Sequence, residues 1–163
     1  MAVEIRQVEP SDLAAVQAVA REAWYAAHAP IIGEQAVEEF LDSYYGRDTL
    51  RERLDEDTVF PVAVDGEAVV GFAVAGPAER KPVTFVLGRL YVIPERWGEE
   101  IGRRLLRRVE ARASDRGGER IRLGVMAEND RAVGFYEAAG YERVGEHDDE
   151  RIGATAYEYG KEL

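Results

Sequence analysis

The 163-residue sequence contains no cysteine, two histidines (His28 and His147) and 21 basic against 32 acidic residues. The lack of cysteine excludes disulfides, thiolate metal sites and cysteine nucleophiles. A zinc site would need carboxylates for most of its ligands, so we expect no metal site. The net charge of −11 disfavours electrostatic binding to nucleic acid or to anionic membranes, and we expect neither as a partner.

Long apolar runs are also missing, since none approaches the roughly 20 residues that span a bilayer. The segment from Met1 to Arg6 carries an acid where a signal peptide would be basic and then apolar, so we expect a cytoplasmic protein. Lysine is scarce: Lys81 and Lys161 are the two lysines, and the other basic residues are arginines. Both a GC-rich genome and a halophilic adaptation, in which salt screens the acidic surface, produce such a composition.

The composition favours one globular domain over residues 1–163, because 46% of the residues are apolar. The sequence contains neither an internal repeat nor a linker that would divide it. The hydrophobic periodicity predicts an alternating order of strands and helices with mixed connections, which is typical of an α+β fold. The expected strands are 3–8, 59–64, 68–75, 83–93, 121–127, 141–146 and 154–160. The expected helices are 13–28, 34–54 with a break near 44–46, 98–116 and 130–139.

A tight hairpin is predicted at Asp65-Gly66, which separates two apolar, β-branched runs. Pro61 lies inside the first run and has no N–H to donate. We therefore expect this part of the strand to lie at a sheet edge or in a bulge.

The segment from Leu90 to Leu106 passes from a strand through a glycine-containing turn directly into a helix. Free backbone N–H groups and the positive end of the helix dipole at such a place can bind a phosphate. An ordinary strand-to-helix connection is the alternative. The segment contains neither G-x-x-x-x-G-K-[ST] nor G-x-G-x-x-G, which excludes the common nucleotide-binding loops.

Three motifs together carry a family resemblance. They are Leu90-Tyr-Val92 followed by Pro94, then Trp97-Gly-Glu-Glu-Ile-Gly102, and then the run from Asn129 to Tyr141 with the pattern N-x-x-A-x-x-F-Y-x-x-x-G-Y. The sequence thereby resembles the GNAT superfamily of acetyl-CoA-dependent N-acetyltransferases over nearly its whole length. The resemblance implies a mixed, mostly antiparallel sheet of six or seven strands flanked by about four helices. It also implies acetyl transfer to a primary amine by direct attack in a ternary complex.

The resemblance further implies a role for each motif. The first motif would hold the pantetheine arm and the thioester carbonyl through the backbone of Leu90, Tyr91 and Val92. The second would hold the pyrophosphate of acetyl-CoA, through Trp97, Gly98, Glu99, Glu100, Ile101, Gly102 and Arg103. In the third, Asn129 would bond the pantetheine or simply cap a helix. Tyr136 matches the general acid that protonates the departing thiolate, with core packing as the alternative.

The second motif departs from the family pattern at two positions. Trp97 replaces the usual Arg or Gln, and Glu100 stands where the second glycine is usual. A glycine there permits unusual dihedral angles and a close approach of the backbone, whereas glutamate adds bulk and negative charge beside a pyrophosphate. We therefore expect weakened binding of the cofactor. One of Arg103, Arg104 and Arg131 is expected to approach its phosphates.

The general base and the acceptor are less defined. Where related enzymes carry a glutamate base, this chain has Phe85, Val86 and Gly124, which leaves Glu128, His147 or a water chain. Five residues fall in the region that shapes the acceptor pocket in the family: Trp24, Tyr25, His28, Tyr44 and Tyr45. Core packing is the alternative for Trp24 and a surface position for His28.

The expected partner is a small-molecule or protein amine, and dimerisation through the C-terminal strands is common in the family. A different interpretation is also open. Glu100 and the missing glutamate base are compatible with a non-catalytic GNAT-fold module that holds CoA or binds a regulatory partner.

Overall fold

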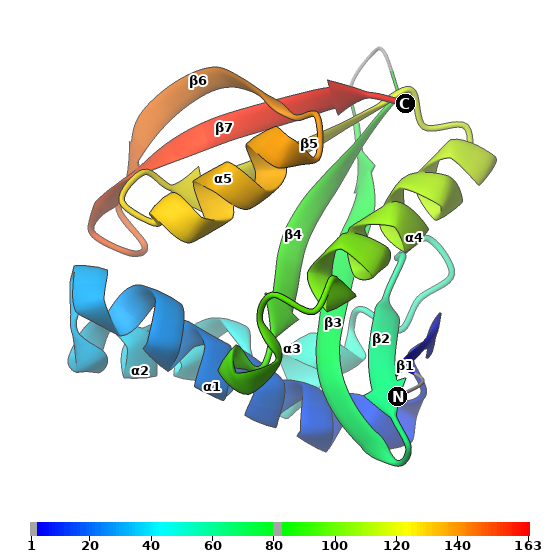
Figure 1. Cartoon of the computed structure of the whole chain (residues 1–163), viewed down its shortest axis with the longest axis horizontal. Helices are drawn as coiled ribbons and strands as arrows, with labels where there is room; N and C mark the ends of the chain where they lie inside the picture. Colours follow the sequence, from blue (N-terminus) through cyan, green and yellow to red (C-terminus); the bar gives the residue numbers. More distant parts are fainter. Residues whose placement is uncertain (1–2, 80–82) are drawn as a thin grey trace.

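The computed structural model describes residues 3–79 and 83–163, so Met1 and Lys81 lie outside the described residues. Seven strands form one sheet in the order β1-β2-β3-β4-β5-β7-β6 (Figure 1). Neighbouring strands are antiparallel except β4 and β5, which are parallel. The predicted α+β fold with a mixed, mostly antiparallel sheet is confirmed.

The strands are β1 (Val3–Gln7), β2 (Pro61–Asp65), β3 (Ala68–Ala78), β4 (Thr84–Val92), β5 (Arg120–Met126), β6 (Glu142–Asp149) and β7 (Ala154–Glu162). The helices are α1 (Leu13–Ile32), α2 (Glu34–Tyr44), α3 (Arg47–Arg51), α4 (Ile101–Asp115) and α5 (Asp130–Ala138). Two 3-10 turns, Pro10–Asp12 and Pro94–Arg96, precede α1 and α4. The short α3 follows the break that the sequence predicted near 44–46.

Helices cover both faces of the sheet, with α1, α2 and α3 on one side and α4 and α5 on the other (Figure 1). Side chains of β3 alternate between the two faces of the sheet. Phe72 and Val74 pack on the side of α1, α2 and α3, and Ala73 and Ala75 pack on the side of α4 and α5. Each face therefore has its own apolar core.

The predicted end of the first helix near residue 28 is too early, because α1 continues through Pro30 to Ile32. A proline so close to the helix end removes one backbone hydrogen bond without stopping the chain from remaining helical. The helix ends at Gly33, which has a φ of 89°. Its N–H donates to the carbonyl of Ala29.

The expectation for Pro61 is also corrected. The strand β2 lies between β1 and β3, so it is not an edge strand, and the register shift with β3 falls between Ala63 and Val64. Pro61 is instead the first residue of β2, and its missing N–H separates the paired strand from the bridge between Val59 and Ala75.

Candidate functional site

The candidate site begins where β4 and β5 separate. They pair only where Thr84 to Leu87 lie beside Arg120 to Leu123, and they then diverge (Figure 1). The rest of β4 keeps its pairing with β3 on the other side. Half of β4 therefore faces a gap rather than a neighbouring strand.

The backbone groups that face the gap follow from the register. The N–H of Ile93 donates to the carbonyl of Val70, which directs the backbone of residue 93 toward β3. Because this direction alternates along an antiparallel pair, the N–H and C=O groups of Leu90 and Val92 point into the gap. The strand presents there the hydrogen-bonding groups that a further strand would use, although the carbonyl of Val92 accepts a hydrogen bond from Trp97.

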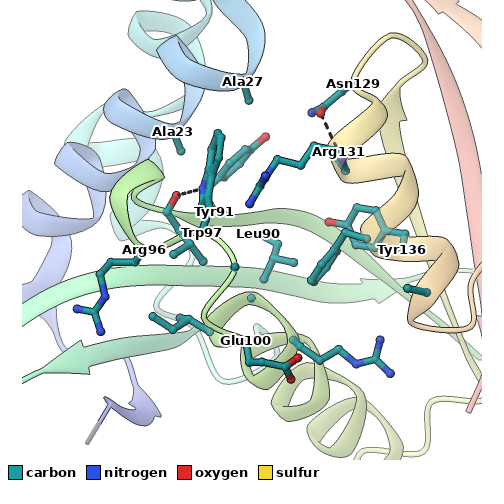
Figure 2. Close-up of a pocket in the computed structure, with 18 of the residues that line it drawn as sticks. Ala23, Ala27, Leu90, Tyr91, Arg96, Trp97, Glu100, Asn129, Arg131 and Tyr136 are labelled. Atoms are coloured by element: carbon teal, nitrogen blue, oxygen red, sulfur yellow. Dashed lines mark hydrogen bonds between the residues drawn. The ribbon is translucent and has the colours of Figure 1, made fainter. Parts of the chain in front are cut away.

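A cavity of about 610 Å³ extends from this gap between α4, α5 and α1 (Figure 2). Its wall includes Leu90, Tyr91, Val92, Trp97, Gly98, Glu100, Ile101, Gly102, Arg103, Asn129 and Tyr136. Of the residues that the three motifs assign to the cofactor or to the general acid, Glu99 alone does not lie on this wall. Glu99 is exposed and lies off the wall, where its carboxylate is 2.8 Å from Nε of Arg96.

The loop that precedes α4 has an unusual backbone. Gly98 has a φ of 86° and Glu100 a φ of 71°, and among the described residues Glu100 is the one non-glycine with a positive φ. The left-handed conformation costs a residue with a Cβ about 1 kcal/mol. This explains in physical terms why a glycine suits position 100.

The first turn of α4 leaves its N–H groups free of a side-chain cap, because Glu100 occupies the N-cap position and makes no capping bond. Ile101, Gly102 and Arg103 of that turn all lie on the cavity wall. The positive end of the helix dipole is therefore directed at the cavity, as an anionic group would require.

Trp97 connects this loop to the gap. Its indole N–H donates to the carbonyl of Val92 at 2.8 Å. The guanidinium carbon of Arg131 lies 4.3 Å from the centre of the Trp97 ring. Arg131 comes from α5, on the other wall of the cavity (Figure 2).

Four arginines line the cavity: Arg96, Arg103, Arg107 and Arg131. Arg96 is used within the chain, since its Nη1 lies 2.9 Å from Asp65 and its Nε contacts Glu99. Among the described residues, no carboxylate pairs with the other three. Sequence reasoning missed Arg107 as a site residue, although it follows Arg103 by four positions and so shares its helix face. Arg104, also predicted, lines a separate groove beside β1.

Tyr136 points from α5 into the cavity (Figure 2). It is 8% exposed, and its ring packs edge-on against Phe135 and Tyr141, with centroids 5.1 and 5.8 Å away. Burial raises the pKa of the Tyr136 phenol well above its ordinary value. The hydroxyl is protonated at neutral pH, as an ordinary phenol is, and burial makes it a weaker acid than a phenol in water.

Asn129 caps α5, as one of the two sequence interpretations held. Its Oδ1 accepts a hydrogen bond from the N–H of Ala132 at 3.2 Å. Because Asn129 also lies on the cavity wall, the amide nitrogen of its side chain remains available to a ligand.

The aromatic residues predicted to shape an acceptor pocket pack mainly against one another. The Trp24 ring lies 4.2 Å from both His28 and Phe40, and Trp24, His28 and Tyr45 are buried. Tyr25 donates its hydroxyl to Glu38. In their place, α1 offers the cavity two small residues, Ala23 and Ala27.

The surface position considered for His28 is wrong, because the side chain is 4% exposed. The signal was present in the sequence, since His28 follows Trp24 by four residues and shares the apolar face of α1. Burial lowers the pKa of His28 to about 4, so the ring is neutral at pH 7.

Neither candidate for the general base lies at the cavity. Glu128 and His147 are exposed and belong to neither wall. In the part of the chain that the structure describes, Glu100 supplies the one carboxylate on the cavity wall, and no histidine lies there. The same residues include no group of three or more acidic, histidine or cysteine side chains that could hold a metal ion.

No helix among residues 3–79 and 83–163 is both long and apolar enough to cross a membrane.

Comparisons with known proteins identify the family. The model of the acetyltransferase (GNAT) family matches residues 18–141. A spermidine N(1)-acetyltransferase of Thermoplasma acidophilum is 30% identical over 150 residues, which cover 86% of this chain and 89% of that protein. An uncharacterised N-acetyltransferase of Mycobacterium bovis is 28% identical over 137 residues, or 83% of this chain and 86% of the relative.

Solved structures show the same fold. The PaiA N-acetyltransferase of Thermoplasma acidophilum, in complex with coenzyme A, has a TM-score of 0.87 and 26% identity, with 100% of both chains covered. Ard1 of Thermoplasma volcanium has a TM-score of 0.77 and 20% identity, covering 100% of this chain and 99% of the other. The chain therefore belongs to the GNAT family of acetyltransferases.

Proposed function

We propose that this enzyme transfers the acetyl group of acetyl-CoA to a primary amine, by direct attack of the amine while both substrates are bound. The observation that carries the proposal is one cavity in which the free half of β4, the first turn of α4 and the Tyr136 hydroxyl meet. The relationship to a structure solved with coenzyme A supports the choice of donor.

The residues present fit the chemical parts of that donor. The N–H groups of Leu90 and Val92 and the carbonyl of Leu90 offer hydrogen bonds of the kind that a strand-like pantetheine arm with two amides can use, while the carbonyl of Val92 already accepts from Trp97. The N–H groups of the first turn of α4 suit a diphosphate, together with Arg103 and Arg107, which pair with no carboxylate of residues 3–79 and 83–163. The cavity volume of about 610 Å³ is in the ordinary range for a small-molecule site.

The reaction needs a polarised carbonyl and a proton for the leaving thiolate. The N–H of Val92, which points into the gap, would donate to the thioester oxygen as negative charge develops on it. Tyr136 would give its proton to the thiolate as the carbon–sulfur bond breaks, while the new carbon–nitrogen bond forms. Water would take the proton from the acceptor, whose ammonium form has a pKa near 10.4 if it resembles lysine.

The first acceptor to test is a polyamine, because a relative that is 30% identical is named a spermidine N(1)-acetyltransferase. Other small amines and protein amines belong in the same panel. The cavity wall supplies two alanines on the α1 side, and these give no polar pattern that favours one amine over another.

Calorimetry with acetyl-CoA, at low and at high salt, tests the donor. Amine-dependent release of free CoA, followed with a thiol reagent, tests the transfer. The protein contains no cysteine and adds no thiol background to that assay. Binding followed by amine-dependent release is the expected result.

Two other outcomes are informative. The absence of measurable binding at millimolar acetyl-CoA would contradict the proposal. Binding without CoA release for any amine in the panel would favour the non-catalytic module, the alternative that Glu100 and the missing carboxylate base support.

A further inference from the structure

Trp97 and Arg131 meet across the cavity from two different elements. Trp97 lies in the loop that precedes α4, and Arg131 lies in the first turn of α5. The guanidinium carbon lies 4.3 Å from the ring centre, which is a close cation–π contact. Figure 2 shows Arg131 reaching toward Trp97 from the opposite wall. The contact therefore joins the two sides of the site.

The orientation of Trp97 is fixed by a second contact. Its indole N–H donates to the carbonyl of Val92, the last residue of β4, at 2.8 Å. The side chain is half-buried, so neighbouring atoms also restrain it. The ring thereby presents a fixed face to Arg131.

Arg131 keeps its hydrogen-bonding capacity in this arrangement. A guanidinium that stacks on a ring still has its N–H groups free at the edge of its plane. Among the described residues no carboxylate pairs with Arg131, although the chain has 32 acidic residues. Arg96, on the other side of the loop, differs because its Nη1 already donates to Asp65 and its Nε to Glu99.

We propose that Trp97 is a positioning residue that holds the Arg131 guanidinium in place to bind the diphosphate of CoA; this rests on the proposed function. The pair supplies from α5 a cation that the loop itself lacks at position 97, and it offsets the negative charge of Glu100. Because Arg131 and Tyr136 share the nine-residue helix α5, a bound diphosphate also fixes the helix that carries the proton donor.

The first test replaces the cation. Arg131→Gln is expected to weaken the binding of CoA about tenfold or more, as for the loss of a charge-assisted hydrogen bond, when measured by calorimetry. With S-acetylpantetheine, which has no diphosphate, the loss in kcat/KM is expected to be several-fold smaller than the loss with acetyl-CoA. A merely structural role for Arg131 would lower kcat/KM by the same factor with both donors and would overturn the proposal.

Arg143→Gln is the matched control. Arg143 lies 4.4 Å from the centre of the Tyr157 ring, so it makes the same type of contact away from the cavity. This variant is expected to bind CoA like the unchanged chain. A loss as large as that of Arg131→Gln would show a general charge effect and would overturn the assignment to Arg131.

The second test is a double-mutant cycle between the two residues. Trp97→Leu is expected to weaken CoA binding several-fold in the unchanged chain, and to have no further effect beside Arg131→Gln. Equal effects in both backgrounds would contradict action through Arg131. Trp97→Phe keeps an aromatic face without the indole N–H, and it is expected to retain more CoA affinity than Trp97→Leu.

The two proposals fail in different ways. Binding of CoA by the unchanged chain, with equal affinity in Arg131→Gln, would overturn only the role of the pair. No binding of CoA by the unchanged chain would overturn the proposed function, and this inference with it.

Discussion

The two faces of the sheet use their polar and aromatic side chains in opposite ways. On the face of α4 and α5, Arg103, Arg107 and Arg131 line a cavity without a carboxylate partner among the described residues. On the face of α1 and α2, the side chains of Trp24 and His28 fill the space between the helices and the sheet. The arginines on the first face are available to bind a ligand, whereas the aromatic side chains on the second face are buried in packing contacts.

This difference indicates where binding and where stability reside. An unpaired arginine gains energy when an anion arrives, whereas a buried aromatic cluster has already gained its energy on folding. We therefore expect changes on the α4 and α5 face to alter catalysis and binding, and changes on the α1 and α2 face to alter the free energy of unfolding.

The largest expected effect concerns Tyr136. Tyr136→Phe removes the proton donor but keeps the ring that packs against Phe135 and Tyr141. General acid catalysis contributes a factor of about a hundred or more, so kcat should fall by that factor while the KM for acetyl-CoA changes little. Steady-state kinetics measure both values. An unchanged kcat would exclude Tyr136 as the proton donor. It would also contradict the expectation that changes on the α4 and α5 face alter catalysis.

The next effect lies on the opposite face, at His28. Its pKa is lowered to about 4 in the folded chain from 6.5 in the unfolded chain, so the unfolded chain binds more protons between these values. His28 therefore does not lower the free energy of unfolding above pH 6.5, and it lowers that free energy progressively as pH falls toward 4. The full loss is about 3 kcal/mol.

His28→Phe should abolish this component while kcat at neutral pH stays unchanged. Urea unfolding of both proteins from pH 7 to pH 4 measures the difference between their free energies of unfolding. That difference should grow in favour of the variant as pH falls. A constant difference would show that His28 does not titrate in this window, and lower activity would place it in the site.

The smallest expected effect concerns Glu100, in the loop that precedes α4. Glu100→Gly should relieve the left-handed backbone at φ 71° and raise the free energy of unfolding by about 1 kcal/mol. It also removes a negative charge from the loop, so acetyl-CoA should bind more tightly. Chemical denaturation and calorimetry measure the two changes.

Glu100→Gln separates the two causes, because it removes the charge and keeps the backbone strain. We expect it to improve binding without a gain in stability. If only Glu100→Gly improves binding, the backbone rather than the charge limits the affinity. Weaker binding by both variants would show that the Glu100 side chain contributes to the site.

Much of the fold was predictable because the relevant signals are local. The period of apolar residues changes from two to about four between the strand ending at Val92 and the helix starting at Ile101, and Asp65-Gly66 marks a hairpin. The family motifs placed Trp97 and Tyr136 in one site from residues almost 40 positions apart. The roles assigned to the individual site residues stay predictions.

The remainder depends on contacts between distant segments. Arg96 is held by Asp65, 31 residues earlier, and no local pattern indicates that pairing. The interior position of β2 depends on β1, so Pro61 could not be assigned from its own segment. The stacking of Arg131 on Trp97 likewise requires α5 to fold back over the loop.

The gap beside β4 has a consequence for the folded chain as a whole. The free half of β4 is an open sheet edge inside the protein, and a ligand that binds there can form the backbone hydrogen bonds that a neighbouring strand would form. A ligand that fills the gap and binds only the folded chain stabilises it by mass action, by about 2.7 kcal/mol at a concentration one hundred times its Kd. The free energy of unfolding of this protein would then rise with the concentration of the ligand that pairs with the free half of β4.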